Sequence, residues 1–277
     1  MRWTPGGRSR NIEDRRGSRV GGGMKMGLGG TVLLLILSLV FGQDFLSTGG
    51  APVDARTAPG EVAGPVDESP EERERVEFVS AVLDSAQKTW ATLLPQATGV
   101  QYREAVLVLY RDAVQSGCGV APAAAGPFYC PLDEKVYIDL SFFDELAQRF
   151  GAPGDFAQAY VLAHEIGHHV QHVLGIDQEV RQRQQADPRR ANDLSVRLEL
   201  QADCLAGVWG NSARHLLEPG DVEEGLTAAA AIGDDRLQRR QSGAVNTDSF
   251  THGSSAQRVE WLRRGLQSGD PNVCDTF

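Results

Sequence analysis

The sequence predicts an α+β fold that is mainly helical, contains a small β-sheet and follows a single membrane-spanning anchor. Three observations predict this arrangement. Apolar residues recur at helical spacing over much of the chain after residue 70, two short runs have the apolar pattern of strands, and one uncharged apolar run lies near the start. With 277 residues, the chain is long enough to bury a sizeable core.

The first part of the chain differs in composition from the rest. Residues 1–23 are rich in Gly and Arg without hydrophobic periodicity, so we expect a disordered basic tail in the cytoplasm. The uncharged run Leu28–Phe41 reaches about twenty residues when its flanks lie at the membrane interfaces. We expect residues 24–46 to form an uncleaved transmembrane signal anchor; a core helix or a cleaved signal peptide are the alternatives. Residues 47–69, which contain several Pro and Gly, are predicted to be a linker.

This arrangement predicts a single-pass protein of the cell membrane with an extracytoplasmic domain, because the basic flank of an anchor stays inside. Residues 1–46 carry seven basic and three acidic side chains, and since the whole chain has a net charge of −10, the remainder carries −14. An acidic domain repels nucleic-acid phosphates and anionic lipids. We therefore expect no nucleic-acid partner, and contact with the cytoplasmic membrane through one N-terminal helix.

The domain over residues 70–277 is predicted to begin with a helix. Ser69, Pro70 and Glu72 have the spacing of a capping box, and apolar residues follow at helical spacing up to Pro95, where the helix is expected to end.

Two strands are expected after this helix. Residues 105–110 have the continuous apolar pattern of a central strand, and residues 136–140 alternate as in a half-buried strand. Between them, residues 116–131 are rich in Gly and Pro and are expected to form a loop.

Further helices are predicted from capping residues and apolar spacing. The first is capped by Asp155 and ended by Gly175, a residue that readily adopts the left-handed conformation. The others begin at three polar sites: Asp187-Pro188, Asp221 with Glu224, and Ser254-Ser255.

Four cysteines follow the apolar run, and an even number outside the cytoplasm is typical of disulfides. The short separation and Gly neighbours favour Cys118 with Cys130, which leaves Cys204 with Cys274. Four unpaired thiols are the alternative. A cysteine zinc site is not favoured, because no C-x-x-C spacing occurs.

The motif that carries chemistry is His164-Glu165-Ile-Gly-His168, an H-E-x-x-H pattern on a predicted helix. Histidines four residues apart project from one helix face and can bind a single metal ion. Glu165 lies beside that ion but is rotated away from it, so its carboxylate is free to accept a proton from an activated water. The pattern therefore predicts a hydrolytic zinc site.

A catalytic zinc site needs a third protein ligand and an open position. The positions where a third histidine would follow the motif hold Gln, Leu and Asp, so that extended pattern fails. Glu199 is the predicted ligand, and Asp203, one turn later, is expected to accept the free ring N–H of a zinc histidine. The alternative is a salt bridge of these carboxylates to Arg197 or Arg214 on a solvated face.

The remaining histidines have different predicted roles. His169 lies off the ligand face, and His172 could pair with His168 by spacing but lacks an adjacent Glu, so both are interpreted as locally hydrogen-bonded or surface residues. His252 lies in a loop before the last predicted helix, and we hypothesise that it stabilises the oxyanion that forms during hydrolysis. An exposed loop histidine and a fourth metal ligand are the alternatives for His252. Arg258 is a candidate second donor.

Together these segments resemble the bacterial putative neutral zinc metallopeptidases, a family of membrane-anchored proteins with a gluzincin-like site. The resemblance covers residues 70–277 and rests on Ser116–Gly119, Gly126–Pro131, Val136–Asp139, His164–Gln171, Glu199–Trp209 and Phe250–Arg258. It implies a zincin-like fold, with zinc on His164, His168 and Glu199 and with Glu165 as the catalytic base.

The combined prediction is a Zn²⁺-dependent peptidase that acts on peptide or protein substrates, which an exposed sheet edge would bind as an added strand. A zinc-stabilised, non-proteolytic scaffold or chaperone at the membrane is the main alternative. A structural helical domain without metal is the third.

Overall fold

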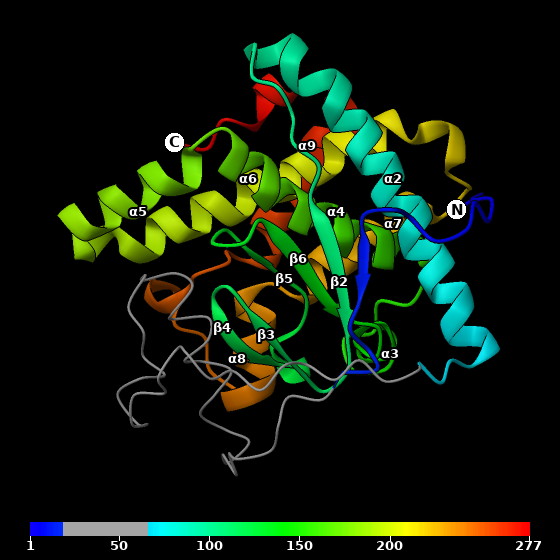
Figure 1. Cartoon of the computed structure of the whole chain (residues 1–277). Helices are drawn as coiled ribbons and strands as arrows, with labels where there is room; N and C mark the ends of the chain where they lie inside the picture. Colours follow the sequence, from blue (N-terminus) through cyan, green and yellow to red (C-terminus); the bar gives the residue numbers. More distant parts are fainter. Residues whose placement is uncertain (19–65) are drawn as a thin grey trace, which may run out of the picture.

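The computed structural model describes residues 1–18 and 66–277. Figure 1 shows the strands β2 and β6 in front of a layer of helices that includes α4, α6 and α9. The strands are β1 (Ile12–Asp14), β2 (Val106–Tyr110), β3 (Ala113–Ser116), β4 (Gly119–Pro122), β5 (Phe128–Cys130) and β6 (Lys135–Asp139). The helices are α2 (Pro70–Thr98), α3 (Phe142–Gln148), α4 (Asp155–Val173), α5 (Ile176–Ala186), α6 (Ala191–Ser212), α7 (Asp221–Ala231), α8 (Asp234–Ser242) and α9 (Ser255–Ser268). The predicted α+β class with a mainly helical content is confirmed.

The main sheet has the strand order β1-β2-β6-β5. β2 pairs in parallel with both β1 and β6, and β5 pairs antiparallel with β6 at the edge. β3 and β4 form a separate two-stranded hairpin. The central position of β2 is as predicted, but β6 is buried along nearly its whole length rather than half-buried, because it also lies inside the sheet.

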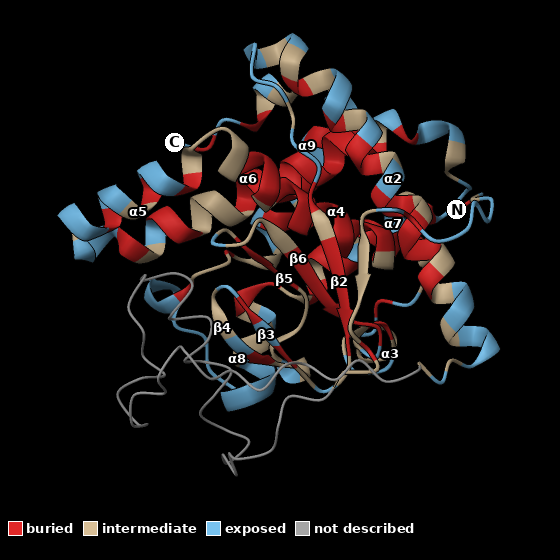
Figure 2. Ribbon diagram, in the orientation of Figure 1, coloured by how far each residue is buried: buried red, intermediate tan, exposed pale blue. Residues whose placement is uncertain are grey.

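Helix α4 lies at the centre of the fold and contacts α2, α6, α7, β5 and β6. It is buried on almost every side, which Figure 2 shows as red at the middle of the molecule. Phe156, Ile166 and Val170 pack into the main core cluster from this helix. A helix surrounded in this way holds its side chains in fixed positions, which suits a site built upon it.

Several element boundaries differ from the predictions. Ser69 caps α2 as expected, but the helix continues through Pro95 to Thr98 and ends at Gly99, whose φ of 76° is left-handed. Burial of the preceding turn, which includes Leu94, keeps the helix intact where proline removes one hydrogen bond. Asp155 is the first residue of α4 but makes no side-chain cap, because the carboxylate of Glu224 accepts the Phe156 N–H instead.

The stretch 116–131 contains the end of β3 together with β4 and β5, so the predicted loop was wrong. These strands have three or four residues each and are interrupted by Gly and Pro, so their periodicity is too short to be recognised. Helix α5 was also not predicted. Both predicted disulfides are confirmed: Cys118 bonds to Cys130 and Cys204 bonds to Cys274.

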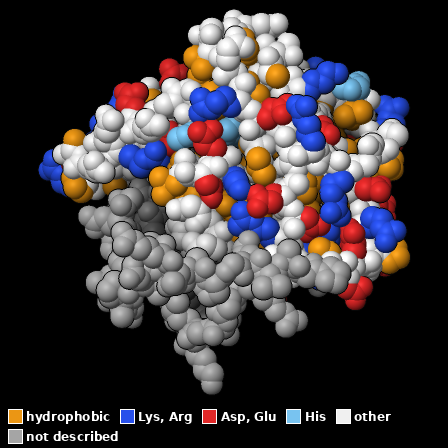
Figure 3. Space-filling model, viewed as in Figure 1, with side chains coloured by type: hydrophobic (Ala, Val, Ile, Leu, Met, Phe, Trp, Pro, Cys, Tyr) orange, Lys and Arg blue, Asp and Glu red, His pale blue; other side chains and the backbone are white. Residues whose placement is uncertain are grey.

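The predicted disorder of residues 1–23 is wrong for residues 1–18, which are ordered against the domain. β1 extends the main sheet, and the Arg16 guanidinium is buried among Asp14, Glu68 and Glu72. Arg8, Arg10 and Arg16 contact carboxylates outside this segment, so their charge favours docking rather than disorder. Figure 3 shows acidic and basic side chains interspersed over this face of the molecule.

The predicted anchor, residues 24–46, and most of the predicted linker, residues 47–69, lie outside the described residues. Among residues 1–18 and 66–277, no helix combines the length and the hydropathy that a membrane span requires.

Candidate metal centre

Two facing helices bring the predicted ligands together. His164 and His168 project from α4 with their ring centroids 4.7 Å apart, and Glu199 faces them from α6. The helices approach closely because Gly167 has no side chain; a Cβ there would lie 2.9 Å from the carbonyl oxygen of Ala202. The site therefore depends on two features of α4: the four-residue spacing of the histidines, and Gly167, which allows α6 to pack closely.

The ligand atoms converge on one point. His164 Nε2 lies 3.2 Å from one carboxylate oxygen of Glu199, and His168 Nε2 lies 3.5 Å from the other. One donor atom from each of the three residues lies within 4.8 Å of the other two. Two imidazole nitrogens and one carboxylate oxygen form the donor set that suits a catalytic zinc ion with an open position.

The other ring nitrogen of each histidine is held by an acceptor. His164 Nδ1 lies 2.8 Å from Asp203 Oδ1, and His168 Nδ1 lies 2.8 Å from the side-chain oxygen of Gln171. A carboxylate and an amide oxygen only accept, so both Nδ1 atoms carry the hydrogen and both Nε2 atoms remain available to a metal. The residues present therefore fit a zinc ion, and Asp203 lies where it can accept the ring N–H of His164.

Gln171 was not predicted, although it lies at i+3 from His168 and is fully buried in a largely apolar helix. Its amide donates to the carbonyl oxygen of Leu198 and to Gln201 Oε1 on α6. A buried glutamine one turn after a ligand is the signal that could have found it, since buried amides require partners.

Asp203 belongs to a buried network. Its carboxylate accepts a 2.6 Å hydrogen bond from the Tyr160 hydroxyl and two from the Arg258 guanidinium at 2.8 and 2.9 Å. Burial alone would raise the pKa of Asp203, but Arg258 and then His164 lower it to about 2. Arg258 donates toward Asp203, Tyr160 and the Ile232 carbonyl, so its predicted role as a second oxyanion donor is not supported.

The ionisation of the ligands follows from the same contacts. Burial alone would lower the pKa of His164, yet the Asp203 carboxylate raises it to about 10 in the chain without metal. Burial works against ionisation of Glu199, but His168 and His252 hold its pKa well below the usual range. Glu199 is therefore an anionic ligand that attracts cations.

Glu165 is buried on the same helix and lines the cavity that contains the ligands. Burial raises the pKa of its carboxyl group above the ordinary value. A raised pKa makes a carboxylate a stronger base, which suits the predicted role in proton transfer.

His252 lies in the same cavity, on a loop fixed by Asp234. One oxygen of Asp234 accepts the backbone N–H groups of Thr251, His252 and Gly253 at 2.7, 2.7 and 3.1 Å, and the other lies 3.2 Å from His252 Nδ1. His252 is neither a freely exposed loop residue nor a member of the group of His164, His168 and Glu199 that could hold a metal ion. Asp234 was not predicted, since nothing in the sequence links it to a loop 18 residues away.

The other two histidines of α4 bind neighbouring segments. His169 is fully buried and lies 2.6 Å from the carbonyl oxygen of Arg103 and 3.0 Å from the Tyr129 hydroxyl, so it connects α4 to β5. His172 Nδ1 lies 3.0 Å from Asp177. His172 is therefore locally hydrogen-bonded, as predicted, and is partly buried, whereas His169 is fully buried and binds segments distant in the sequence.

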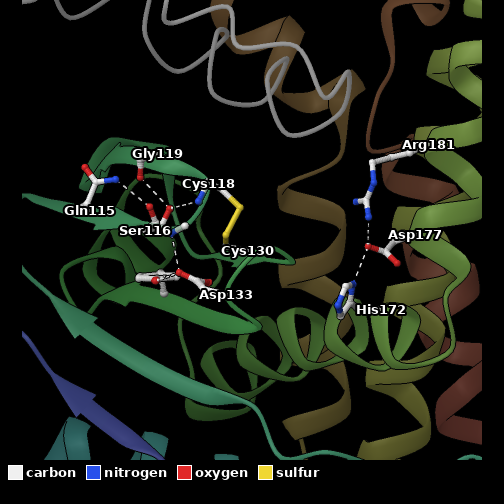
Figure 4. The surroundings of a disulfide bond; sticks show 11 residues. Gln115, Ser116, Cys118, Gly119, Cys130, Asp133, His172, Asp177 and Arg181 are labelled. Carbon is white, nitrogen blue, oxygen red and sulfur yellow. Dashed lines mark hydrogen bonds and ion pairs between the residues drawn. A yellow bond between two sulfur atoms is a disulfide. The ribbon is translucent and has the colours of Figure 1, made fainter. Parts of the chain in front are cut away.

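The cavity has a volume of about 330 Å³ and extends along α4 past the ligands. In Figure 4 the Cys118–Cys130 disulfide lies on one side, and the ion pair of Asp177 with Arg181 lies on the other. Cys118, Asp177 and Arg181 line the cavity, and so do Phe128 and Tyr129 of the edge strand β5. The site is therefore a cleft between a strand edge and a helical wall.

The chain is similar to known bacterial proteins over its full length. It is 47% identical over 291 residues to the uncharacterized protein YpfJ of Escherichia coli, covering 100% of this chain and 99% of that protein. It is 45% identical over 212 residues to the uncharacterized protein Rv2575 of Mycobacterium tuberculosis, covering 72% of this chain and 69% of that protein. No solved structure matches. A family model described as "Putative neutral zinc metallopeptidase" matches residues 1–277, in agreement with the metal-ligand geometry, and the chain therefore belongs to that family.

Proposed function

We propose that the chain is a zinc-dependent peptidase in which His164, His168 and Glu199 hold the metal and Glu165 is the general base. The observation that carries the proposal is the convergence of these four residues in one cavity, with both histidines presenting Nε2. A zinc ion held there would supply Lewis-acid chemistry, polarising a carbonyl and lowering the pKa of water.

The protein's own residues supply the rest of the reaction. The Glu165 carboxylate accepts a proton from the attacking water and then delivers it to the leaving amine. His252, with Nδ1 held by Asp234, presents its other nitrogen to the cavity and donates to the developing oxyanion. Such a donor contributes about 3 kcal/mol to lowering the barrier.

The substrate is a peptide in an extended conformation. β5 is the last strand in the order of the main sheet and lines the cavity through Phe128 and Tyr129. A peptide can add to such an edge as a further strand, because backbone hydrogen bonds hold it without regard to sequence.

The test compares the parent protein with Glu165→Gln, both purified as the full chain. Metal analysis is expected to find equal zinc in the two, and a peptide-library digest to find cleavage only by the parent, because the substitution removes the base and keeps every ligand. Near-parental cleavage by Glu165→Gln would contradict the mechanism. Zinc in both proteins with cleavage by neither would favour the zinc-stabilised scaffold.

A further inference from the structure

The two ends of the cavity differ in chemistry. At one end the wall consists of Phe142 from α3, Val161 from α4, and Ile232 and Leu237 from α7–α8. At the other end the wall is formed by α5 and α6 and includes the polar residues Asp177, Arg181, Gln184 and Ser195 together with Val180 and Leu198. The first wall is wholly apolar, whereas the second carries several polar side chains.

The apolar end lies beside the reacting groups. Val161 precedes His164 by three residues and Glu165 by four on α4, so all three side chains share one helix face. The polar end lies near Gln171, ten residues further along α4, which corresponds to roughly 15 Å. An extended peptide spans that distance with about four to five residues. The apolar wall therefore faces a residue beside the bond that reacts, and the polar wall faces residues further away.

The apolar wall is fixed by the same contacts that fix His252. Asp234 holds the His252 loop and lies between Ile232 and Leu237 in the chain. Gly233 abuts Ser255, where a Cβ would lie 2.4 Å from the backbone nitrogen, and the Ile232 carbonyl accepts from Arg258. A wall held at a constant position relative to the reacting groups can select among side chains.

We propose that the cavity contains a specificity subsite for a large apolar side chain of the peptide, adjacent to the scissile bond. The subsite is formed by Phe142, Val161, Ile232 and Leu237, and this proposal rests on the proposed function. A Leu or Phe side chain removes its surface from water there, whereas Ala leaves the wall uncovered and a charged side chain loses its hydration. Discrimination of about 10- to 100-fold in kcat/KM between Leu and Ala is expected, as for other apolar pockets.

The first experiment measures kcat/KM for peptides that differ only at the residues flanking the cleaved bond. The parent is expected to prefer Leu or Phe over Ala and Glu at one of these positions. Leu237→Lys is expected to remove that preference and to favour Glu, because a cation then faces the side chain. Leu237 is partly exposed on α8, so the variant is expected to fold. Leu132→Lys is the matched control, since Leu132 is 77% exposed and does not line the cavity.

The second experiment measures the Kd of the same peptides for Glu165→Gln by calorimetry, with and without Leu237→Lys. Binding does not require turnover, so the subsite is tested independently of the proposed reaction. Cleavage without an apolar preference, or an unchanged Leu-to-Glu ratio in Leu237→Lys, would overturn the subsite and leave the peptidase intact. No cleavage, together with a Leu-selective Kd that Leu237→Lys abolishes, would overturn the peptidase and leave the subsite.

Discussion

Two carboxylates beside the candidate metal centre act by holding other residues of the site in place. Asp203 receives hydrogen bonds from His164, Tyr160 and Arg258, and Asp234 receives three backbone N–H groups and faces His252. Neither carboxylate belongs to the group formed by His164, His168 and Glu199. Their role is orientation, because a ligand with a fixed tautomer and rotamer binds without reorganisation.

The first prediction separates the ligand Glu199 from the supporting residue Asp203. Glu199→Ala is expected to lose zinc binding outright, whereas Asp203→Asn should weaken it by roughly ten- to a hundredfold. Asn preserves the shape and a hydrogen-bonding group, but it leaves the buried Arg258 charge without its carboxylate, so folding of the variant is checked first. Zinc titration with a competing chelator measures both affinities. Equal, parent-like affinities would assign the third ligand to another residue.

The second prediction concerns His252. His252→Ala is expected to lower kcat about a hundredfold with zinc content unchanged, because an oxyanion donor acts mainly in the transition state. Asp234→Asn should lower kcat less, since the loop keeps part of its hydrogen bonding. Leu132→Ala is the control, because Leu132 is exposed and does not line the cavity. Parental or higher activity of His252→Ala would exclude the donor role.

The third prediction is that zinc affinity increases with pH. The pKa of His164 is raised to about 10 without metal, so its ring carries an extra proton at neutral pH, and the pKa of His168 is raised as well. Zinc binds only the deprotonated nitrogen, so each proton released makes the affinity rise about tenfold per pH unit below the pKa. Titrations between pH 6 and 8 measure the slope. A flat profile would show that the rings are already neutral.

At the scale of elements, glycines set the distances between the helices that carry the site. Gly167 admits α6 against α4, and Gly265 of α9 packs on α6, where a Cβ would lie 2.0 Å from the Cys204 carbonyl oxygen. Backbone atoms cannot yield as a flexible side chain does. The position of Glu199 relative to the two histidines therefore depends on residues that have no side chain.

The fourth prediction is that Gly265→Ala destabilises the fold although alanine favours helices. The helix propensity gain of up to about 1 kcal/mol is expected to be outweighed by overpacking of about 1–3 kcal/mol or more. Gly6→Ala is the matched control, because a Cβ at Gly6 meets nothing within 4 Å. Urea unfolding measures both variants. A stabilised Gly265→Ala would mean that α9 shifts without cost.

The clustering of His164, His168 and Glu199 could be predicted from the sequence, because a metal demands particular residue types at helical spacings. β5 was missed because three residues between Pro127 and Pro131 have too little periodicity. The contact of Arg258 with Asp203 was not predicted, because it joins segments 55 residues apart and local patterns contain no information on such pairs.

At the scale of the whole molecule, distant parts of the sequence are held in one body. The Cys204–Cys274 disulfide joins α6 to the C-terminal segment across 70 residues. At the other end of the sequence, Ser9 donates to Asp84 of α2, and Lys135 of β6 pairs with Glu13 of β1. Both ends of the described chain therefore pack against the body that contains α4 and α6, the helices that carry His164, His168 and Glu199.

The fifth prediction is that positions 5 and 91 are labelled alike in cells. Pro5 precedes β1 and Ala91 lies on α2; both are exposed, and the four native cysteines are in disulfides, so Pro5→Cys and Ala91→Cys each introduce one reactive thiol. A membrane-impermeant maleimide applied to intact spheroplasts is expected to label both variants or neither. Labelling of one alone would contradict the docking of residues 1–18. Lysed cells, in which both thiols react, provide the control.

Hydrogen bonds between two neighbouring strands require that both strands lie on the same side of a membrane. β1 and β2 lie in register with Ile12 beside Leu107, and two strands cannot pair through the thickness of a bilayer. We infer that Ser18 and Val66, the described residues on either side of the apolar run, face the same compartment. The expected arrangement of a cytoplasmic tail and an extracytoplasmic domain places these two strands on opposite sides of the membrane, so the labelling of positions 5 and 91 tests it directly.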